Sequence, residues 1–231
     1  MAIIALSVAL VAPHPASSNP STPVGSAVLP SGSFSQHMGQ VVYTSNFGAS
    51  QGWDVGSVNA NTNITLSNGQ YRVTGGTLVH HALLTPYGVP QRGMSIEASA
   101  TGYPTDNVSI GVGCQSAFGI SPSLVYQLVT YPDGQWYIEE ARVPGTVETL
   151  LSGDAAPLGS AASLQLTCVI TGKTSGTETT QLVGYVNGTE VGAIGDRIHQ
   201  QVGGYMPILV LGTFGPTVST TFTGVTVRKV G

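Results

Sequence analysis

Short stretches of alternating apolar and polar residues follow one another along the chain from Val41 onward. Gly, Asn, Asp or Pro separates them at intervals of about ten residues, which is the pattern of half-buried β-strands joined by tight turns. No stretch has a convincing helical periodicity, although Asp196–Val202 could form one helical turn. The alternation therefore predicts an all-β fold, either a two-sheet antiparallel β-sandwich or a barrel.

The expected strands are Val41–Phe47, Ile64–Leu66, Gln70–Thr74, Thr77–Leu83, Met94–Ala100, Val108–Gln115, Val125–Thr130, Gln135–Arg142, Leu164–Ile170, Gln181–Val186, Glu190–Ile194, Ile208–Leu211 and Thr220–Lys229. Turn residues support this assignment, because Asn-Gly and Asp-Gly pairs tolerate the positive φ angles of tight hairpins. Such pairs occur at Asn68-Gly69, Asp133-Gly134 and Asn187-Gly188. Gly224 interrupts the alternation of the last strand, which predicts a β-bulge there.

The two cysteines lie in phase with the apolar residues of their strands, with Val108, Ile110 and Val112 before Cys114, and with Leu164, Leu166 and Ile170 around Cys168. If the two strands are neighbours, a disulfide across this span of 54 residues would stabilise the fold by about 4 kcal/mol. Two buried reduced thiols are the alternative. We favour the disulfide, because the composition independently indicates an oxidising compartment.

Only 8% of the 231 residues are charged, against about 25% in an ordinary soluble domain. Ser, Thr, Asn, Gln and Gly must therefore solvate most of the surface, as they do in secreted β-proteins. The seven Lys and Arg residues are scattered and the formal net charge is -4. No row of cations is available to neutralise phosphates, so we expect no nucleic-acid partner.

Three regions differ in composition. Residues 1–12, with the sequence MAIIALSVALVA, are uncharged and mostly apolar, but shorter than the roughly 20 residues of a membrane-spanning helix. They fit a truncated export signal or part of a transmembrane helix, and a buried strand is the alternative. Residues 13–40 form a Pro/Ser/Gly-rich linker that we expect to be a disordered or extended tether. Residues 41–231 form the β-sandwich domain, which we expect outside the cytoplasm, secreted or tethered to the cell surface.

Several sequence patterns lack the context that their chemistry requires. GKT at Gly172–Thr174 has no leading glycine of a phosphate loop, and no G-x-S-x-G nucleophile turn is present. His80 and His81 are adjacent in an expected strand, so their side chains point to opposite faces and cannot bind one ion together. A site that combines one of them with His199 is conceivable, but we expect no metal and no cofactor.

Glu139 and Glu140 are also adjacent in a strand and cannot act as a pair of glycosidase carboxyls. One of them could still act with Glu97, Asp106 or Glu148 from another segment. The same strand contributes to a cluster of aromatic residues in YQLVTYPDGQWYIEEA, from Tyr126 to Ala141. Alternation divides these rings between the core and the opposite face.

The order of several segments resembles the concanavalin A-like lectin/glucanase superfamily, most closely small exported bacterial jelly-roll domains of the laminin-G and sugar-hydrolase-like kind. The resemblance covers about Val41 to Gly231 and rests on VVYTSNFGASQGW, NGQYRVTGG, MSIEASATGYPTDNVSIGVGC, YQLVTYPDGQWYIEEA, LLSG, LQLTC and LVGYVNGTEVGAI. It implies a jelly roll of two stacked antiparallel sheets, a concave face that often receives carbohydrate, and pairing of the first strand with the last.

The chain lacks the E-x-D-x-x-E pattern of the catalytic branch, so no catalytic residue follows from the resemblance. The calcium ligands of the lectin branch are likewise not identifiable, and Asp106-Asn107 is only a loop candidate. We therefore expect a non-catalytic module that recognises carbohydrate or another cell-envelope component, with Trp136, Tyr137 and Glu139 as ligand-binding residues. The alternatives are a hydrolase of glycosides or modified sugars with carboxylates in the concave groove, and a structural or sensory ectodomain with a protein partner.

Overall fold

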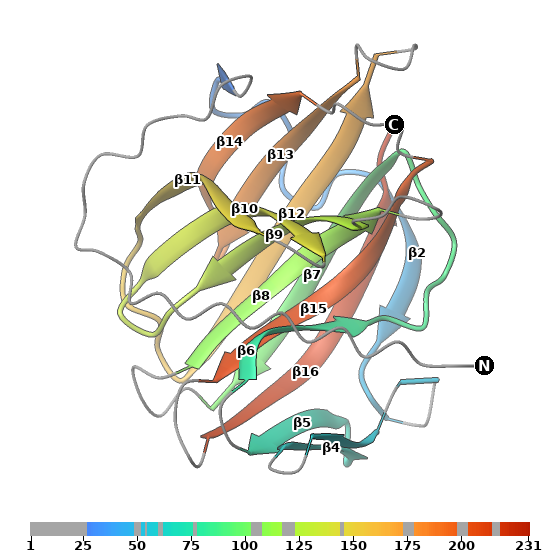
Figure 1. Ribbon diagram of the computed structural model, residues 1–231, viewed down its shortest axis with the longest axis vertical. Coiled ribbons are helices and arrows are strands. Elements are labelled where there is room, and N and C mark those ends of the chain that lie inside the picture. Colours follow the sequence, from blue (N-terminus) through green and yellow to red (C-terminus); the bar gives the residue numbers. More distant parts are fainter. Residues whose placement is uncertain are drawn as a thin grey trace.

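The computed structural model describes residues 27–48, 52–53, 55–59, 62–75, 78–102, 108–116, 123–143, 146–172, 178–197, 203–213 and 218–231. These residues form two antiparallel sheets that stack face to face (Figure 1). The expected all-β sandwich is therefore confirmed. Within the described ranges there is no helix of the length and apolarity required to cross a membrane.

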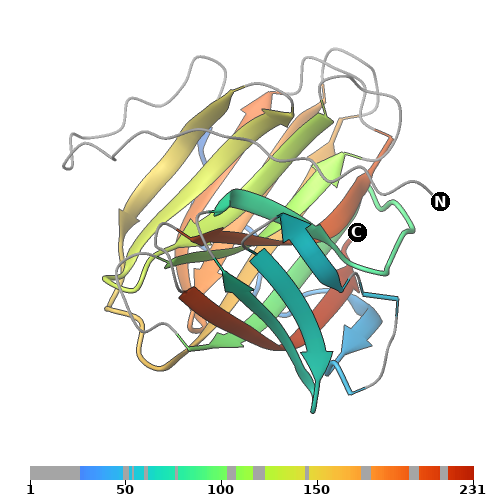
Figure 2. The same cartoon turned by 60° about the horizontal axis from the view of Figure 1, so that its bottom comes forward.

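The larger sheet has ten strands in the order β1 (Ala27–Val28), β14 (Thr189–Arg197), β13 (Thr179–Val186), β12 (Ala161–Thr171), β7 (Gly93–Thr101), β16 (Val218–Lys229), β5 (Gln70–Gly75), β4 (Thr62–Ser67) and β3 (Gly56–Asn59), and β2 (Gln40–Ser45) also pairs with β16. The pairing of β2 with β16 is the first-to-last pairing that the resemblance implied. Figure 2 turns the end of this sheet with β4 and β5 toward the viewer.

The smaller sheet has six strands in the order β11 (Val147–Asp154), β10 (Gln135–Val143), β9 (Ser123–Thr130), β8 (Val108–Ser116), β15 (Tyr205–Thr213) and β6 (Leu78–Leu84). The inner faces of the two sheets share one core of apolar side chains. We call the face that points away from the larger sheet the outer face of the six-stranded sheet.

The turn and bulge predictions agree with the backbone. Asn187 and Gly188 connect β13 to β14 with φ angles of 50° and 80°, and Asn68-Gly69 connects β4 to β5 in the same way. The register between β16 and β7 shifts between Phe222 and Gly224, which is the expected bulge. The helical turn at Asp196–Val202 is wrong for its first two residues, because Asp196 and Arg197 continue β14 and pair with β13. Residues 198–202 lie outside the described residues.

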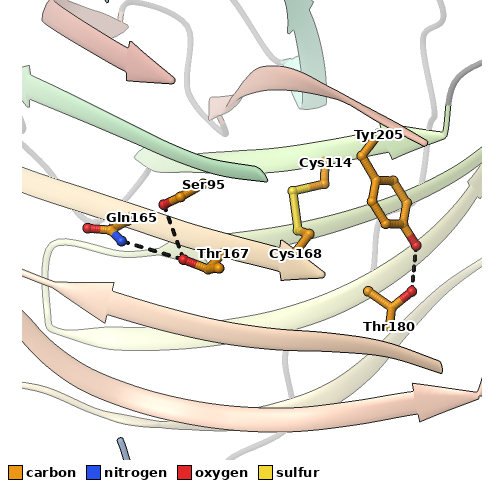
Figure 3. The surroundings of a disulfide bond; sticks show 7 residues. All are labelled: Ser95, Cys114, Gln165, Thr167, Cys168, Thr180 and Tyr205. Atoms are coloured by element: carbon orange, nitrogen blue, oxygen red, sulfur yellow. Dashed lines mark hydrogen bonds between the residues drawn. A yellow bond between two sulfur atoms is a disulfide. The ribbon is translucent and has the colours of Figure 1, made fainter. Parts of the chain in front are cut away.

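Cys114 on β8 and Cys168 on β12 form a disulfide between the two sheets, with Cα atoms 6.6 Å apart (Figure 3). Both cysteines are fully buried in the shared core. The in-phase alternation that placed each sulfur on an apolar face thus corresponds to the observed contact. Since β8 and β12 belong to different sheets, the covalent bond joins the two layers of the sandwich.

Residues 27–39 form a strap across the ten-stranded sheet, on the face away from the core. Leu29 and Phe34 of the strap pack against Tyr185 and its apolar neighbours, and the Leu29 amide donates to the Ala193 carbonyl at 2.9 Å. His37 Nδ1 lies 3.0 Å from Glu97 Oε2. The sequence predicted an extended or disordered tether here, because the few apolar residues of this Pro/Ser-rich segment have no periodic spacing.

Candidate functional site

The predicted ligand-binding residues lie on both faces of β10. Trp136 points into the core and is 5% exposed. Its indole fits beside two glycines, since a Cβ added at Gly153 would lie 2.7 Å from Trp136 Cζ2 and one at Gly192 would lie 3.0 Å from Cη2. Trp136 therefore packs in the core and is not part of the outer face of the six-stranded sheet. Tyr137 and Glu139 point to the outer face of the six-stranded sheet.

Glu139 pairs with a residue that the sequence alone did not single out. Gln127 on β9 lies directly opposite Glu139 on β10, and Gln127 Nε2 donates to Glu139 Oε2 at 2.7 Å. Only 4% of Gln127 and 2% of Glu139 are exposed. A buried carboxylate requires polar partners, so this hydrogen bond holds the Glu139 side chain in place. The register that follows from the Asp133-Gly134 turn is the signal that could have identified Gln127.

Two tyrosines lie farther along the same hairpin. Tyr131 and Tyr137 are half-buried, and their rings meet edge to face with centroids 5.8 Å apart. The Tyr137 hydroxyl donates to Gln135 Oε1 at 3.0 Å. Burial, followed by the nearby Glu139 charge, raises the pKa of Tyr131 above its usual range, so its phenol stays protonated. The pair thus presents aromatic surface together with neutral hydroxyl groups.

Negative charge surrounds these rings. Asp133 in the turn and Asp154 at the end of β11 are both exposed. Burial, and then the charges of Asp133, Glu139 and Asp154, raises the pKa of Tyr137. We use the name hairpin patch for Tyr131, Asp133, Gln135, Tyr137 and Asp154, with the buried Gln127–Glu139 pair behind it. This patch combines two rings with several oxygen acceptors.

The other acidic candidates lie elsewhere. Glu140 points between the sheets, opposite in direction to Glu139, as the pleat required. Glu97 lies on the ten-stranded sheet beside His37, and Glu148 is exposed on β11 opposite Glu140. Asp106, Asn107 and His199 lie outside the described residues, as do the side chains of His80 and His81. Among the side chains that the structure describes, no group of three or more His, Cys, Asp or Glu residues could hold a metal ion.

A groove of about 490 Å³ lies beside β4, in the other sheet. Its walls include the side chains of Phe47, Val55 and Leu66 with those of Asn63 and Thr65. Phe47 also stacks on Tyr71 with ring centroids 5.4 Å apart, so the groove rests on a buried aromatic cluster. The described residues that line the groove are all uncharged, whereas the hairpin patch combines rings with carboxylates. We therefore take the hairpin patch as the stronger candidate for ligand binding.

Comparison with solved structures shows that the chain shares its fold with known proteins. No protein-family model and no curated protein matches the sequence. The laminarinase catalytic domain from Thermotoga maritima is similar with a TM-score of 0.55 and 10% identity, over 84% of this chain and 99% of that domain. Alginate lyase vAL-1 from Chlorella virus has a TM-score of 0.54 and 11% identity, over 77% and 93% of the two chains.

A protein of unknown function with a galectin-like fold from Bacillus subtilis is also similar, with a TM-score of 0.54 and 10% identity. The alignment covers 83% of this chain and 96% of that protein. At sequence identities this low, structural similarity shows a shared fold, and the activity has to be inferred from the residues of the site. The chain therefore shares its two-sheet jelly-roll fold with these solved structures, which is consistent with the resemblance to the concanavalin A-like lectin/glucanase superfamily.

Proposed function

We propose that this protein is an extracytoplasmic, non-catalytic β-sandwich module that recognises carbohydrate, or another cell-envelope component, through the hairpin patch. The observation that carries the proposal is the half-buried Tyr131–Tyr137 pair beside exposed carboxylate and amide oxygens. Small-ligand sites commonly combine aromatic surface with a few fixed polar groups. A sugar ring has an apolar C–H face that stacks on an aromatic ring and hydroxyl groups that donate to oxygen acceptors.

The charge of the patch favours a neutral glycan over a polyuronate. Glu139, Asp133 and Asp154 act together on the Tyr137 phenol and all three are acidic. A uronate carboxylate would experience repulsion from them, whereas a neutral sugar hydroxyl can donate to the same oxygens. Several solved structures with this fold are named as a laminarinase or an alginate lyase, which suggests laminarin and alginate as the neutral and acidic probes.

The proposed location rests on two independent features. The disulfide between the sheets suits an oxidising environment, and the low content of charged residues is common in secreted β-proteins. Residues 1–12, which lie outside the described residues, would supply the export signal or the membrane attachment. The strap then continues from this amino-terminal part onto the ten-stranded sheet, which is the layer opposite the hairpin patch.

Affinity electrophoresis in gels that contain laminarin or alginate tests the proposal. We expect laminarin to retard the wild-type protein more than alginate does, and Tyr137→Ala to weaken laminarin binding by roughly tenfold, since a lost stacking contact costs about 1 kcal/mol or more. Tyr87→Ala is the matched control, because Tyr87 is also half-buried in a tyrosine pair, with Tyr43, on a different segment. Equal binding of the Tyr137→Ala and wild-type proteins would show that the patch is not the site.

A hydrolase of glycosides or modified sugars is the second candidate, because Glu139 is a buried carboxylate held in position beside the tyrosines. It would require a second carboxyl group, and Asp133 and Asp154, which act with Glu139 on the pKa of Tyr137, are the candidates. Incubation with laminarin, followed by chromatography of released oligosaccharides, separates the two candidates. Binding without release supports the module, whereas release that Glu139→Gln abolishes without a loss of binding supports the hydrolase.

A further inference from the structure

A second cluster of ionisable side chains lies inside the sandwich, on the inner faces of β9, β10 and β14. Tyr126 and Glu140 belong to the six-stranded sheet and Asp196 belongs to the ten-stranded sheet. Glu140 and Asp196 are each only 7% exposed, and Tyr126 is fully buried. These residues are not part of the proposed glycan site.

One hydrogen bond of the cluster crosses from one sheet to the other, and a second lies within β10. The Tyr126 hydroxyl donates to Asp196 Oδ2 at 2.5 Å, and Arg142 Nε donates to Glu140 Oε1 at 2.6 Å. Glu140 lies directly opposite Tyr126 in the β9–β10 strand pair, and a hydrogen-bonding interaction with Asp196 contributes to the raised pKa of Glu140. Two neighbouring buried carboxylates repel each other when both are ionised, which favours a form in which one carboxyl group keeps its proton.

Among the side chains that the structure describes, the groups around the pair include no second cation that would balance it. Tyr205 on β15 lies edge to face with Tyr126 at 5.9 Å, and its hydroxyl is 2.5 Å from Thr180 Oγ1 on β13 (Figure 3). Burial raises the pKa of both phenols, which therefore stay neutral. Two further acids are the exposed Glu148, opposite Glu140 on β11, and the buried Glu178, which Arg92 binds at 3.0 Å.

We propose that Glu140 and Asp196 form a proton-dependent clasp between the two sheets. One shared proton joins the carboxyl groups in acidic solution. When that proton leaves as the pH rises through about 7, two buried negative charges face each other, and among the described side chains Arg142 balances only one of them. The side chain of Arg142 is 40% exposed, so water screens part of its charge. The contact between the two sheets at β10 and β14 is then weakened.

The direction of the pH dependence follows from the environment of Glu140. Burial first, and then the hydrogen bond to Asp196, raises the pKa of Glu140 from 4.5 to about 7, although Arg142 opposes the change. Between pH 4.5 and about 7, the Glu140 carboxyl group therefore keeps its proton in the folded protein but has lost it in the unfolded chain. The stabilisation is complete below about pH 4.5 and is lost as the pH rises through about 7. The difference of about 2.5 pH units corresponds to a decrease of at most roughly 300-fold in the ratio of folded to unfolded protein.

Urea unfolding of the full chain between pH 4.5 and 8.5 tests the clasp. Glu140→Gln keeps an oxygen that accepts from Arg142 and an amide that donates to Asp196, so we expect its stability to lose most of this pH dependence. Glu148→Gln is the matched control, because it removes the charge of an exposed acid directly across the strand pair. It should follow the wild-type curve. Identical slopes for the wild-type and Glu140→Gln proteins would overturn the proposal.

Carboxyl ¹³C NMR of the wild-type protein gives a test that does not depend on how the variant folds. We expect the Glu140 resonance to titrate with a midpoint near pH 7. In Asp196→Asn the midpoint should fall, because the carboxyl group that shares the proton is gone. A wild-type midpoint near 4.5, or a midpoint that stays in place in Asp196→Asn, would contradict a shared proton.

Discussion

Trp136 and Tyr137 are chain neighbours, and the pleat of β10 gives them different roles. Trp136 fills the space left by Gly153 and Gly192 in the core, whereas Tyr137 faces outward beside Tyr131. A large ring enters a tightly packed layer only where its neighbours have no side chain. The division of aromatic residues between the core and the outer face agrees with the alternation of the sequence, but the space beside Trp136 depends on residues from two other strands.

The same close packing makes a prediction for Gly111 on β8. A Cβ at this position would lie 2.4 Å from the Leu128 carbonyl oxygen and 3.1 Å from Val210 Cβ, so backbone would have to move. We expect Gly111→Ala to destabilise the protein by about 1–3 kcal/mol in urea unfolding. Gly159→Ala is the control, because no other atom lies within 4 Å of the added methyl group. A Gly111→Ala protein as stable as this control would show that β8 accepts a side chain there.

At the scale of the element, hairpin turns fixed the register that builds the candidate site. The Asp133-Gly134 turn pairs Trp136 with Thr130, and the alternation from that point brings Gln127 opposite Glu139. Turn dipeptides are visible in sequence because few residues tolerate a positive φ. Neither β11 nor the strap has a comparable signal. The strand β11 combines a short apolar run with polar ends, and the apolar residues of the strap that pack on the sheet, Leu29 and Phe34, are only partly buried.

The β13–β14 hairpin offers a direct test of turn chemistry. Gly188 has a φ of 80°, a conformation that costs an L-residue about 1–2 kcal/mol. We expect Gly188→Ala to lower the melting temperature by about 2–6 °C. Gly224→Ala serves as the comparison, because this bulge glycine has no positive φ and its added methyl group would lie 3.9 Å from the nearest atom, the Ser45 carbonyl oxygen. Equal melting temperatures of the two variants would mean that the turn relaxes without cost.

At the scale of the whole molecule, a disulfide and a pair of carboxyl groups are among the contacts that connect the two layers of the sandwich. The Cys114–Cys168 disulfide joins β8 to β12 through the core, and the Glu140–Asp196 pair joins β10 to β14. The first connection is covalent and the second depends on a proton. Both lie on the inner faces, so they act on the stacking of the sheets and leave the hairpin patch on the outer face untouched.

Loss of the disulfide should therefore affect stability far more than binding. We expect Cys114→Ser with Cys168→Ser to lower the free energy of unfolding by about 4 kcal/mol, because the unfolded chain regains the freedom of the closed span of 54 residues. Urea unfolding of the oxidised wild-type protein and the double variant measures the difference. In gels that contain laminarin, the folded double variant should be retarded as strongly as the wild-type protein. Unchanged stability would show that the bond does not constrain the unfolded chain.

The sequence by itself determined the class of fold and the direction of most side chains, because period-two alternation and turn dipeptides are local properties of the backbone. It placed both sulfurs on apolar faces, separated Glu139 from Glu140 and identified the hairpins. Only the tertiary structure decided which strands outside these hairpins became neighbours. The meeting of Glu140 with Asp196 and the packing of the strap on the ten-stranded sheet depend on how separate segments stack. These contacts join segments far apart in the chain, and alternation specifies which face a residue occupies but not which residue it meets.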